Sequence, residues 1–167
     1  ALYEQIQIYI TRFVQEFSQG EMMEPNWEKI HIWHGWGASD HQGLYRYFSH
    51  ATQTRFRGYT EALGFFGTLS GRFAFDKCCE ELLAVDIPEQ FDAILVDEAQ
   101  DFAENYFRLC YRALREPKRL IWGYDEVQSL EELKIPTAET LFGKDADGKP
   151  LVDLSGTYPG EIQQDEI

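Results

Sequence analysis

Two apolar runs with a helical segment between them dominate the pattern of the chain. Residues 93–96 read Ala-Ile-Leu-Val, a length and a degree of branching that predict a strand buried on both faces. A second apolar run covers residues 119–123. The segment from about Glu104 to Arg115 carries a broad apolar stripe at helical spacing, and Pro117 is predicted to end it. Strand, helix and strand in this order predict a βαβ unit with a right-handed crossover, and therefore a parallel sheet.

Helices are predicted over most of the chain before these runs. Residues 2–18 place apolar side chains at near-helical spacing, whereas residues 27–33 alternate between apolar and polar side chains as a strand does. Residues 38–86 favour helices interrupted by glycines. The buried face of the last of these helices is predicted to consist of Phe73, Cys78, Leu82 and Leu83. Together these elements indicate an α/β protein.

Acidic residues follow the first apolar run at once. Asp97, Glu98 and Asp101 stand at the carboxyl end of the predicted strand, which is the edge where open α/β sheets bind their ligands. Carboxylates placed so close together repel one another unless a cation or a proton relieves the repulsion. The pattern therefore indicates a magnesium ion bound together with a nucleotide phosphate. The alternative interpretation is a solvated acidic turn after a core strand.

The sequence around these carboxylates resembles motif II, the Walker B element, of superfamily 1 helicases of the UvrD/Rep type. The pattern of that family is Asp-Glu-any-Gln-Asp, and Asp97, Glu98, Gln100 and Asp101 match it at every fixed position. The family pattern also places a strand directly before the motif, and residues 93–96 supply one.

The second apolar run is followed by a segment that resembles motif III of the same family. That motif reads Gly-Asp-any-any-Gln-Ser-Ile after a strand, and Asp125, Gln128 and Ser129 keep its spacing. Tyr124 departs from the pattern, because it occupies the position of the family's glycine, while Gly123 lies one position earlier. The alternative interpretation is a polar turn after a strand.

A third segment, Trp33-His34-Gly35, resembles motif Ib, which contacts the backbone of single-stranded DNA in this family. A histidine at this position is able to hydrogen-bond a phosphate, and exposed aromatic side chains are able to stack on bases. Ile32 departs from the family pattern, because a threonine hydroxyl is usual there. The end of a strand with a core tryptophan and a capping histidine explains the same residues equally well, so both interpretations stay open.

The resemblance implies specific roles in ATP hydrolysis. Asp97 is expected to hold Mg²⁺, through a water molecule, and Glu98 to orient and deprotonate the attacking water. Gln128 is expected to sense the γ-phosphate of ATP. The residues expected to bind the nucleotide or to link its site to motif III and neighbouring domains are Gln100, Asp101 and Asp125.

The domain organisation implied by the resemblance has three parts. Residues 1–37 correspond to part of a RecA-like motor domain with the helix after motif Ia and the strand of motif Ib. Residues 38–86 correspond to a helical insertion similar to subdomain 1B, and residues 87–167 to the motor domain with motifs II and III. No Gly-x-x-x-x-Gly-Lys-Ser/Thr loop occurs in the sequence. We therefore expect a partial RecA-like parallel sheet flanked by helices, inactive in isolation, in a larger protein that holds the remaining helicase domains.

The amino-acid composition indicates which class of protein and which kinds of surface to expect. The 167 residues are 44% hydrophobic and 15% aromatic, as expected of a globular domain. No apolar stretch approaches the roughly 20 residues of a membrane span. The three cysteines contain no CxxC pair, which indicates structural thiols and a cytoplasmic setting. The net charge of −14 argues against a general nucleic-acid surface.

The expected function is that of an ATP-dependent DNA helicase, in which this chain contributes to translocation on single-stranded or partly duplex DNA. One alternative is a UvrD-like ATPase that serves signalling or defence without processive unwinding. Another is a non-catalytic acidic binding domain on the same fold. Five basic residues either face DNA or are ordinary solvated side chains, the second being favoured: Arg46, His50, Arg55, Arg57 and Arg72.

Overall fold

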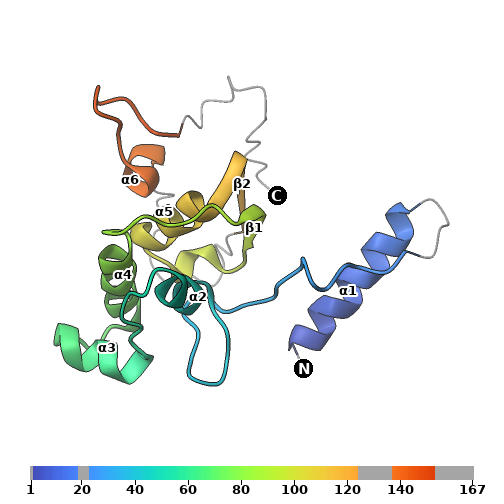
Figure 1. The fold of residues 1–167 in the computed structure, drawn as a ribbon, viewed down its shortest axis with the longest axis horizontal. Helices are drawn as coiled ribbons and strands as arrows, with labels where there is room; N and C mark the ends of the chain where they lie inside the picture. The colour runs from blue at the N-terminus through green and yellow to red at the C-terminus, as the bar shows by residue number, and fades with distance from the viewer. Residues whose placement is uncertain (1, 19–22, 124–136, 153–167) are drawn as a thin grey trace. The chain divides into compact units, whose positions relative to one another are not determined.

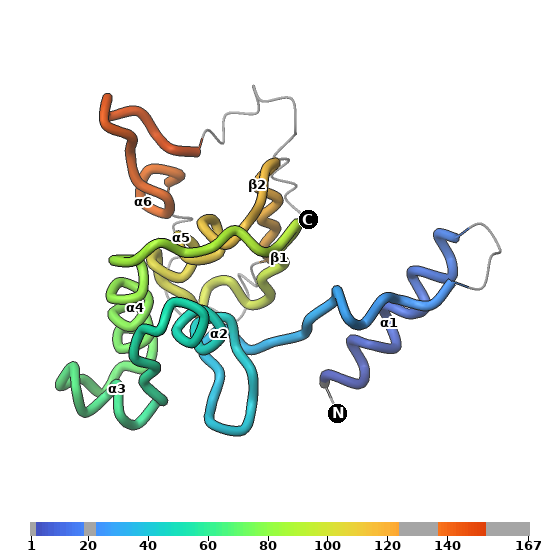
Figure 2. The backbone as a smooth tube through the Cα atoms, in the orientation of Figure 1, coloured from blue at the N-terminus to red at the C-terminus, as the bar shows by residue number. Residues whose placement is uncertain are grey.

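A computed structural model describes residues 2–18, 23–123 and 137–152. The chain divides into two compact units, residues 1–34 and residues 35–167 (Figure 1). Figure 2 traces the path of the backbone through both. Among the described residues, no helix is both long enough and apolar enough to cross a membrane.

The first unit is built on helix α1, Leu2–Phe17. Its last turn closes at Ser18, whose backbone N–H donates to the carbonyl of Val14 at 3.0 Å and whose hydroxyl donates to the carbonyl of Gln15 at 2.8 Å. The helix predicted over residues 2–18 is therefore confirmed. Phe13 and Phe17 lie one turn apart on an exposed side of α1 and stack with ring centroids 6.4 Å apart.

The prediction of a strand over residues 27–33 is wrong. Residues 27–29 form a turn, and the following residues adopt no regular structure. Asn26 nucleates the turn, because its side-chain oxygen accepts from the N–H of Glu28 at 3.1 Å and its carbonyl accepts from the N–H groups of Lys29 and Ile30. A short asparagine side chain that bonds nearby backbone competes with extended structure, and the alternating pattern does not reveal that competition.

The second unit combines helices with a small sheet. Its α-helices are α2 (Leu44–Ala51), α3 (Tyr59–Phe66), α4 (Gly71–Leu82), α5 (Glu104–Ala113) and α6 (Ala138–Phe142). Its strands are β1 (Phe91–Val96) and β2 (Leu114–Trp122), and a 3₁₀ turn, η1, spans Ala99–Asp101. The described part of the chain is thus an α/β structure, as predicted.

Strands β1 and β2 are parallel neighbours, and α5 connects them. Residues 93–96 pair in register with residues 119–122, so the predicted parallel strand–helix–strand unit is confirmed. The helix, however, ends at Ala113 and not at Arg115. Pro117 lies inside β2, where the register jumps and the strand does not pair residue by residue with β1. A proline lacks the N–H of a ladder bond, so an irregular stretch of strand accommodates it.

The sheet is covered on one face only among the described residues. On the covered face, Trp122 packs edge-on against Phe107 of α5, with ring centroids 5.9 Å apart, and Val96 is buried beside it. On the other face, Leu95 is 73% exposed and its register partner Ile121 is 58% exposed. The prediction that residues 93–96 are buried on both faces is therefore wrong for this part of the chain.

The helices of the second unit share one core. Helix α4 packs against α3, α2 and α5, and α5 packs against α6. Cys78 and Leu82 are fully buried as predicted, but Phe73 is 47% exposed. Phe75 is buried instead, together with Ala74 and Cys79, so the inward face keeps Cys78 and Leu82 but excludes Phe73. Residues 38–86 therefore pack directly on the helix of the βαβ unit; their likeness to subdomain 1B stays a prediction.

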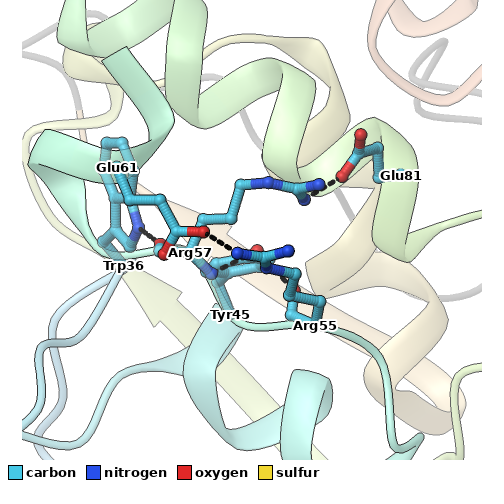
Figure 3. Close-up of polar contacts among 6 residues, drawn as sticks. All are labelled: Trp36, Tyr45, Arg55, Arg57, Glu61 and Glu81. Carbon is cyan, nitrogen blue, oxygen red and sulfur yellow. Dashed lines mark hydrogen bonds and ion pairs between the residues drawn. The ribbon is translucent and has the colours of Figure 1, made fainter. Parts of the chain in front are cut away.

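Arg57 ties the segment between α2 and α3 to the helices around it (Figure 3). Its side chain is nearly buried, its guanidinium pairs with Glu81 at the end of α4, and the same group lies 4.0 Å from the ring centroid of Phe65 in α3. The carbonyl of Arg57 accepts from the indole N–H of Trp36 at 2.8 Å. A buried guanidinium requires such partners, because an unpaired charge in the interior is costly.

A polar chain links α4, α5 and α6. Both carboxylate oxygens of Asp76 accept hydrogen bonds from Asn105, one from its backbone N–H at 3.0 Å and one from its amide at 2.9 Å. The amide oxygen of Asn105 accepts in turn from Arg108, which also donates to the carbonyls of Thr140 and Leu141. Because no side chain caps α5 within its own first turn, Asp76 satisfies an N–H that the helix itself leaves open.

We predict that Asp76→Ala destabilises the protein by about 1–3 kcal/mol, because it leaves the amide and N–H of the buried Asn105 without their acceptors. Equilibrium unfolding in urea, followed by circular dichroism, measures the change. The matched control is Asp86→Ala, which removes an exposed carboxylate beyond the end of α4 and should alter stability by less than about 0.5 kcal/mol. Equal effects of the two substitutions contradict the assigned role of Asp76.

Candidate functional site

The carboxyl end of β1 passes into an acidic segment, residues 97–101, which we call the acid loop. Its backbone is bonded to the end of the neighbouring strand: Ala99 donates to the carbonyl of Gly123 at 2.9 Å, and Gly123 donates to the carbonyl of Val96 at 2.9 Å. The ends of β1 and β2 thus lie at one edge of the sheet, as the sequence predicted. The acid loop is held at that edge by backbone bonds, which do not depend on its side chains.

Glu98 has an unusual backbone conformation. Its φ of 51° and ψ of 47° lie in the left-handed region, which costs a residue with a Cβ about 1–2 kcal/mol relative to ordinary conformations. The conformation is supported by Asp97, whose side-chain oxygen accepts from the N–H of Glu98 at 3.1 Å, and by the N–H of Asp101, which donates to the carbonyl of Glu98 at 3.0 Å. Such conformations outside glycine gather at functional sites.

The side chains of the acid loop reach solvent. Asp97, Glu98 and Asp101 are exposed, whereas Ala99 is buried and anchors the loop. The amide of Gln100 donates to a carboxylate oxygen of Glu98 at 2.5 Å, so the structure brings these two predicted site residues together. Solvent screens the repulsion among exposed carboxylates, and this exposure leaves them accessible to a hydrated cation.

Among the described residues, the exposed Asp97 is the candidate ligand for a magnesium ion that keeps most of its water. The described residues contain no group of three His, Cys, Asp or Glu side chains arranged to hold a metal ion. Magnesium is commonly held by one or two carboxylates together with substrate phosphates and water, and not by a cage of protein ligands alone. The exposed carboxylate of Asp97 fits that mode of binding. A closed structural metal site, with several protein ligands around the ion, does not fit the described residues.

Phe102 anchors the acid loop to the helices. Its ring stacks on Tyr106, with centroids 4.1 Å apart, and packs against Phe75 of α4 at 6.0 Å. Its carbonyl accepts from the guanidinium of Arg72 at 3.0 Å. Gly35 lies against the same ring, because a Cβ at that position would stand 2.6 Å from Cε1 of Phe102. The sequence did not point to these contacts, since nothing in the pattern relates Gly35 or Arg72 to the acid loop.

The three residues of the predicted DNA contact have different surroundings. Trp33 is half-buried and stacks on His31 with ring centroids 4.7 Å apart, and His34 is exposed with Tyr3 edge-on to its ring at 5.5 Å. Gly35 begins the second unit and packs on Phe102. Contact of this segment with DNA stays a prediction.

The residues predicted from motif III lie outside the described residues. These are Tyr124, Asp125, Gln128 and Ser129. The described segment before them ends at Gly123, which is bonded to Val96 at the end of β1 and to Ala99 in the acid loop.

Four of the basic residues singled out in the sequence make contacts within the fold. Arg57 and Arg55 pair with Glu81 and Glu61, and Arg72 bonds the carbonyl of Phe102. The guanidinium of Arg46 donates to the carbonyls of Ala38 and His41. The favoured expectation of an ordinary solvated side chain is wrong for Arg57, which is buried. A DNA-facing role of the other three arginines stays an open alternative.

The three cysteines are buried thiols. Burial raises the pKa of Cys78 to about 11 and that of Cys110 to about 12, and it raises the pKa of Cys79 well above its ordinary value. Thiols with raised pKa values stay protonated near neutral pH and are poor nucleophiles and metal ligands. The prediction of structural thiols agrees with these surroundings.

Comparison with known proteins yields no relative: no protein-family model, no curated protein and no solved structure matches the chain.

The backbone conformation of Glu98 leads to a prediction about stability. Glu98→Gly should be more stable than Glu98→Ala by about 1 kcal/mol, because only glycine adopts the left-handed region without steric cost. Chemical unfolding of both variants measures the difference. The same pair of substitutions at Glu80, inside α4, should show the reverse order, because glycine is about 1 kcal/mol less favourable than alanine in a helix. Glu98→Ala equal to or more stable than Glu98→Gly contradicts the left-handed conformation.

Proposed function

We propose that the acid loop forms the magnesium-binding and water-activating part of an ATPase site of the UvrD-like helicase type. In the complete protein, this site would couple ATP hydrolysis to movement on DNA. The observation that carries the proposal is the placement of the Asp-Glu-Ala-Gln-Asp sequence at the carboxyl end of a parallel strand, bonded to the end of the next strand. This is the edge where α/β sheets bind nucleotides.

The chemistry proposed for each residue rests on the resemblance to the family, and the position of each residue supports it. When bound, Mg²⁺ would neutralise charge on the β- and γ-phosphates. Asp97 is exposed at the strand end and would bind this ion through a water molecule. Glu98, which is exposed next to Asp97, would accept the proton of the attacking water. Gln100 bonds the Glu98 carboxylate and would orient it for that transfer.

The other proposed roles rest on the resemblance of the sequence to the family. Asp101 and Asp125 would link the nucleotide site to the rest of the motor. Gln128 would contact the γ-phosphate, because an amide donates hydrogen bonds but does not titrate and so cannot act as a base. The phosphate-binding loop and the remaining domains would come from other parts of the complete protein, and single-stranded DNA would be its polymer substrate.

We predict that Glu98→Gln in the complete protein lowers the kcat of ATP hydrolysis by about 10²–10⁴-fold, because it removes the base and keeps the shape of the side chain. ATP binding should persist, as measured by titration with a fluorescent nucleotide. Glu89→Gln, an exposed glutamate before β1, is the control and should hydrolyse ATP normally. Normal turnover by Glu98→Gln removes Glu98 from the proposed mechanism. If the unmodified protein does not hydrolyse ATP, a non-catalytic binding role replaces the proposal.

Asp97→Asn should weaken the binding of Mg²⁺ and leave the transfer of the water proton to Glu98 intact. Loss of the carboxylate charge should raise the Mg²⁺ concentration needed for half-maximal hydrolysis by about tenfold or more, since charge dominates binding of a hard cation. Asp92→Asn serves as the control, because Asp92 is an exposed aspartate of the same strand that pairs with Arg115 at 3.1 Å, away from the acid loop. A magnesium dependence of Asp97→Asn that equals that of Asp92→Asn contradicts the metal assignment.

A further inference from the structure

Helix α4 contacts the chain where the acid loop passes into α5. Its residues Arg72 and Asp76 lie one turn apart and therefore on the same face of the helix. The guanidinium of Arg72 donates to the carbonyl of Phe102, the residue after the acid loop, at 3.0 Å. The carboxylate of Asp76 accepts from the backbone N–H and the amide of Asn105 in the first turn of α5. Two side chains of one helix thus hold both ends of the short segment that joins the acid loop to α5.

The bond from Arg72 acts on the turn that follows Glu98. The N–H of Asp101 donates to the carbonyl of Glu98 at 3.0 Å, and the N–H of Phe102 donates to the carbonyl of Ala99 at 3.2 Å. Phe102 closes this turn, and Arg72 fixes its carbonyl. At the other end, the N–H of Ala99 donates to the carbonyl directly after β2 at 2.9 Å. The turn is therefore held at one end by the sheet and at the other end by α4.

Glu98 depends on a turn held in this way because of its backbone. Its φ of 51° and ψ of 47° are left-handed, a conformation that a residue with a Cβ keeps only where the surrounding structure enforces it. If the turn loosens, the backbone of Glu98 relaxes toward ordinary conformations, and the direction of its side chain changes with it. The hydrogen bond from the amide of Gln100 to the Glu98 carboxylate would be lost in the same movement.

We propose that Arg72 is a positioning residue for water activation: by fixing the carbonyl of Phe102, it keeps the Glu98 carboxylate in the direction that the attacking water requires. The inference rests on the proposed ATPase function and adds to it a residue from outside the motif. Arg72 acts through the turn and not on the metal ion or the nucleotide. Its bond to Phe102 is exposed, so the loss of this bond should loosen the turn without unfolding the helices.

The test is Arg72→Met in the complete protein, because methionine keeps an apolar stem and removes the donors. The kcat should fall about tenfold or more, with and without an oligodeoxythymidine strand, since small misplacements of a catalytic group are expensive. The KM for ATP should change by less than about twofold, because Arg72 does not contact the nucleotide. Arg72→Lys keeps a donor on a long stem and should return kcat to within about threefold of that of the unmodified protein.

A second substitution shows whether Arg72 acts through Glu98. In the Glu98→Gln background the base that Arg72 positions is absent, so Arg72→Met should lower the remaining kcat by less than about twofold. An equal fold-loss of kcat in both backgrounds means that Arg72 affects hydrolysis by another route, and it overturns the proposal.

Arg112→Met is the matched control. The guanidinium of Arg112 in the last turn of α5 donates to the carbonyl of Leu83 at the end of α4 at 2.8 Å, so the substitution removes an exposed bond of the same kind between the same two helices. Arg112→Met should keep kcat within about twofold of the unmodified value, because this bond lies away from the acid loop. The two variants should have similar midpoints of unfolding in urea.

Three further results overturn the positioning role. A protein with Arg72→Met that does not fold assigns Arg72 to general stability. A normal kcat in Arg72→Met, combined with a higher DNA concentration for half-maximal stimulation, assigns Arg72 to DNA contact. A kcat of Arg72→Lys as low as that of Arg72→Met rules out the hydrogen bond as the cause.

These results leave the ATPase proposal intact, because the Glu98→Gln variant tests that proposal by itself. If the unmodified protein does not hydrolyse ATP, the proposed function fails, and the role of Arg72 fails with it.

Discussion

The parallel pairing of β1 with β2 is the constraint on which the described structure depends. Parallel neighbours cannot be joined by a tight turn, so the chain must cross over between them, and α5 makes that crossing. The pairing places both carboxyl ends at one edge. There the backbone bonds between Ala99, Val96 and Gly123 hold the acid loop at the end of the neighbouring strand. The position of the carboxylates thus follows from the sheet and not from bonds among their own side chains.

Helix α4, which precedes the sheet in the chain, supports the edge of the sheet where the acid loop lies. Asp76 of α4 caps α5, and Arg72 of the same helix bonds the carbonyl of Phe102 where the acid loop ends. Glu98 keeps a left-handed backbone conformation, which is costly for a residue with a side chain. The hydrogen bonds around it hold its backbone in that conformation. A loop that only turned the chain would place glycine or asparagine there.

The sequence predicted the elements and their order better than their surroundings. Helix α1, the βαβ unit and the acidic strand end follow from local periodicity, which short-range contacts determine. The run at residues 93–96 predicted a strand correctly, but an apolar run does not reveal which faces neighbours cover, and Leu95 is exposed here. The strand expected at residues 27–33 failed because one side chain, Asn26, forms a turn that alternation does not encode.

The same limit applies to the candidate site. Asp97, Glu98 and Gln100 were identifiable because their spacing is local, and the structure brings Gln100 to Glu98. The roles of Gly35, Arg72 and Phe102 were not identifiable, because they arise from contacts between residues distant in the chain. A glycine required by close approach to a ring looks in the sequence like any other glycine in a turn.

If the acid loop binds the metal ion of a nucleotide complex, as we propose, locating that ion is the most direct test. The measurement is anomalous diffraction from crystals of the complete protein with Mn²⁺ in place of Mg²⁺ and a non-hydrolysable ATP analogue. The account predicts one manganese peak at the carboxyl edge of the sheet, joined to Asp97 directly or through one water molecule. A bound nucleotide whose manganese peak lies away from Asp97 would contradict it.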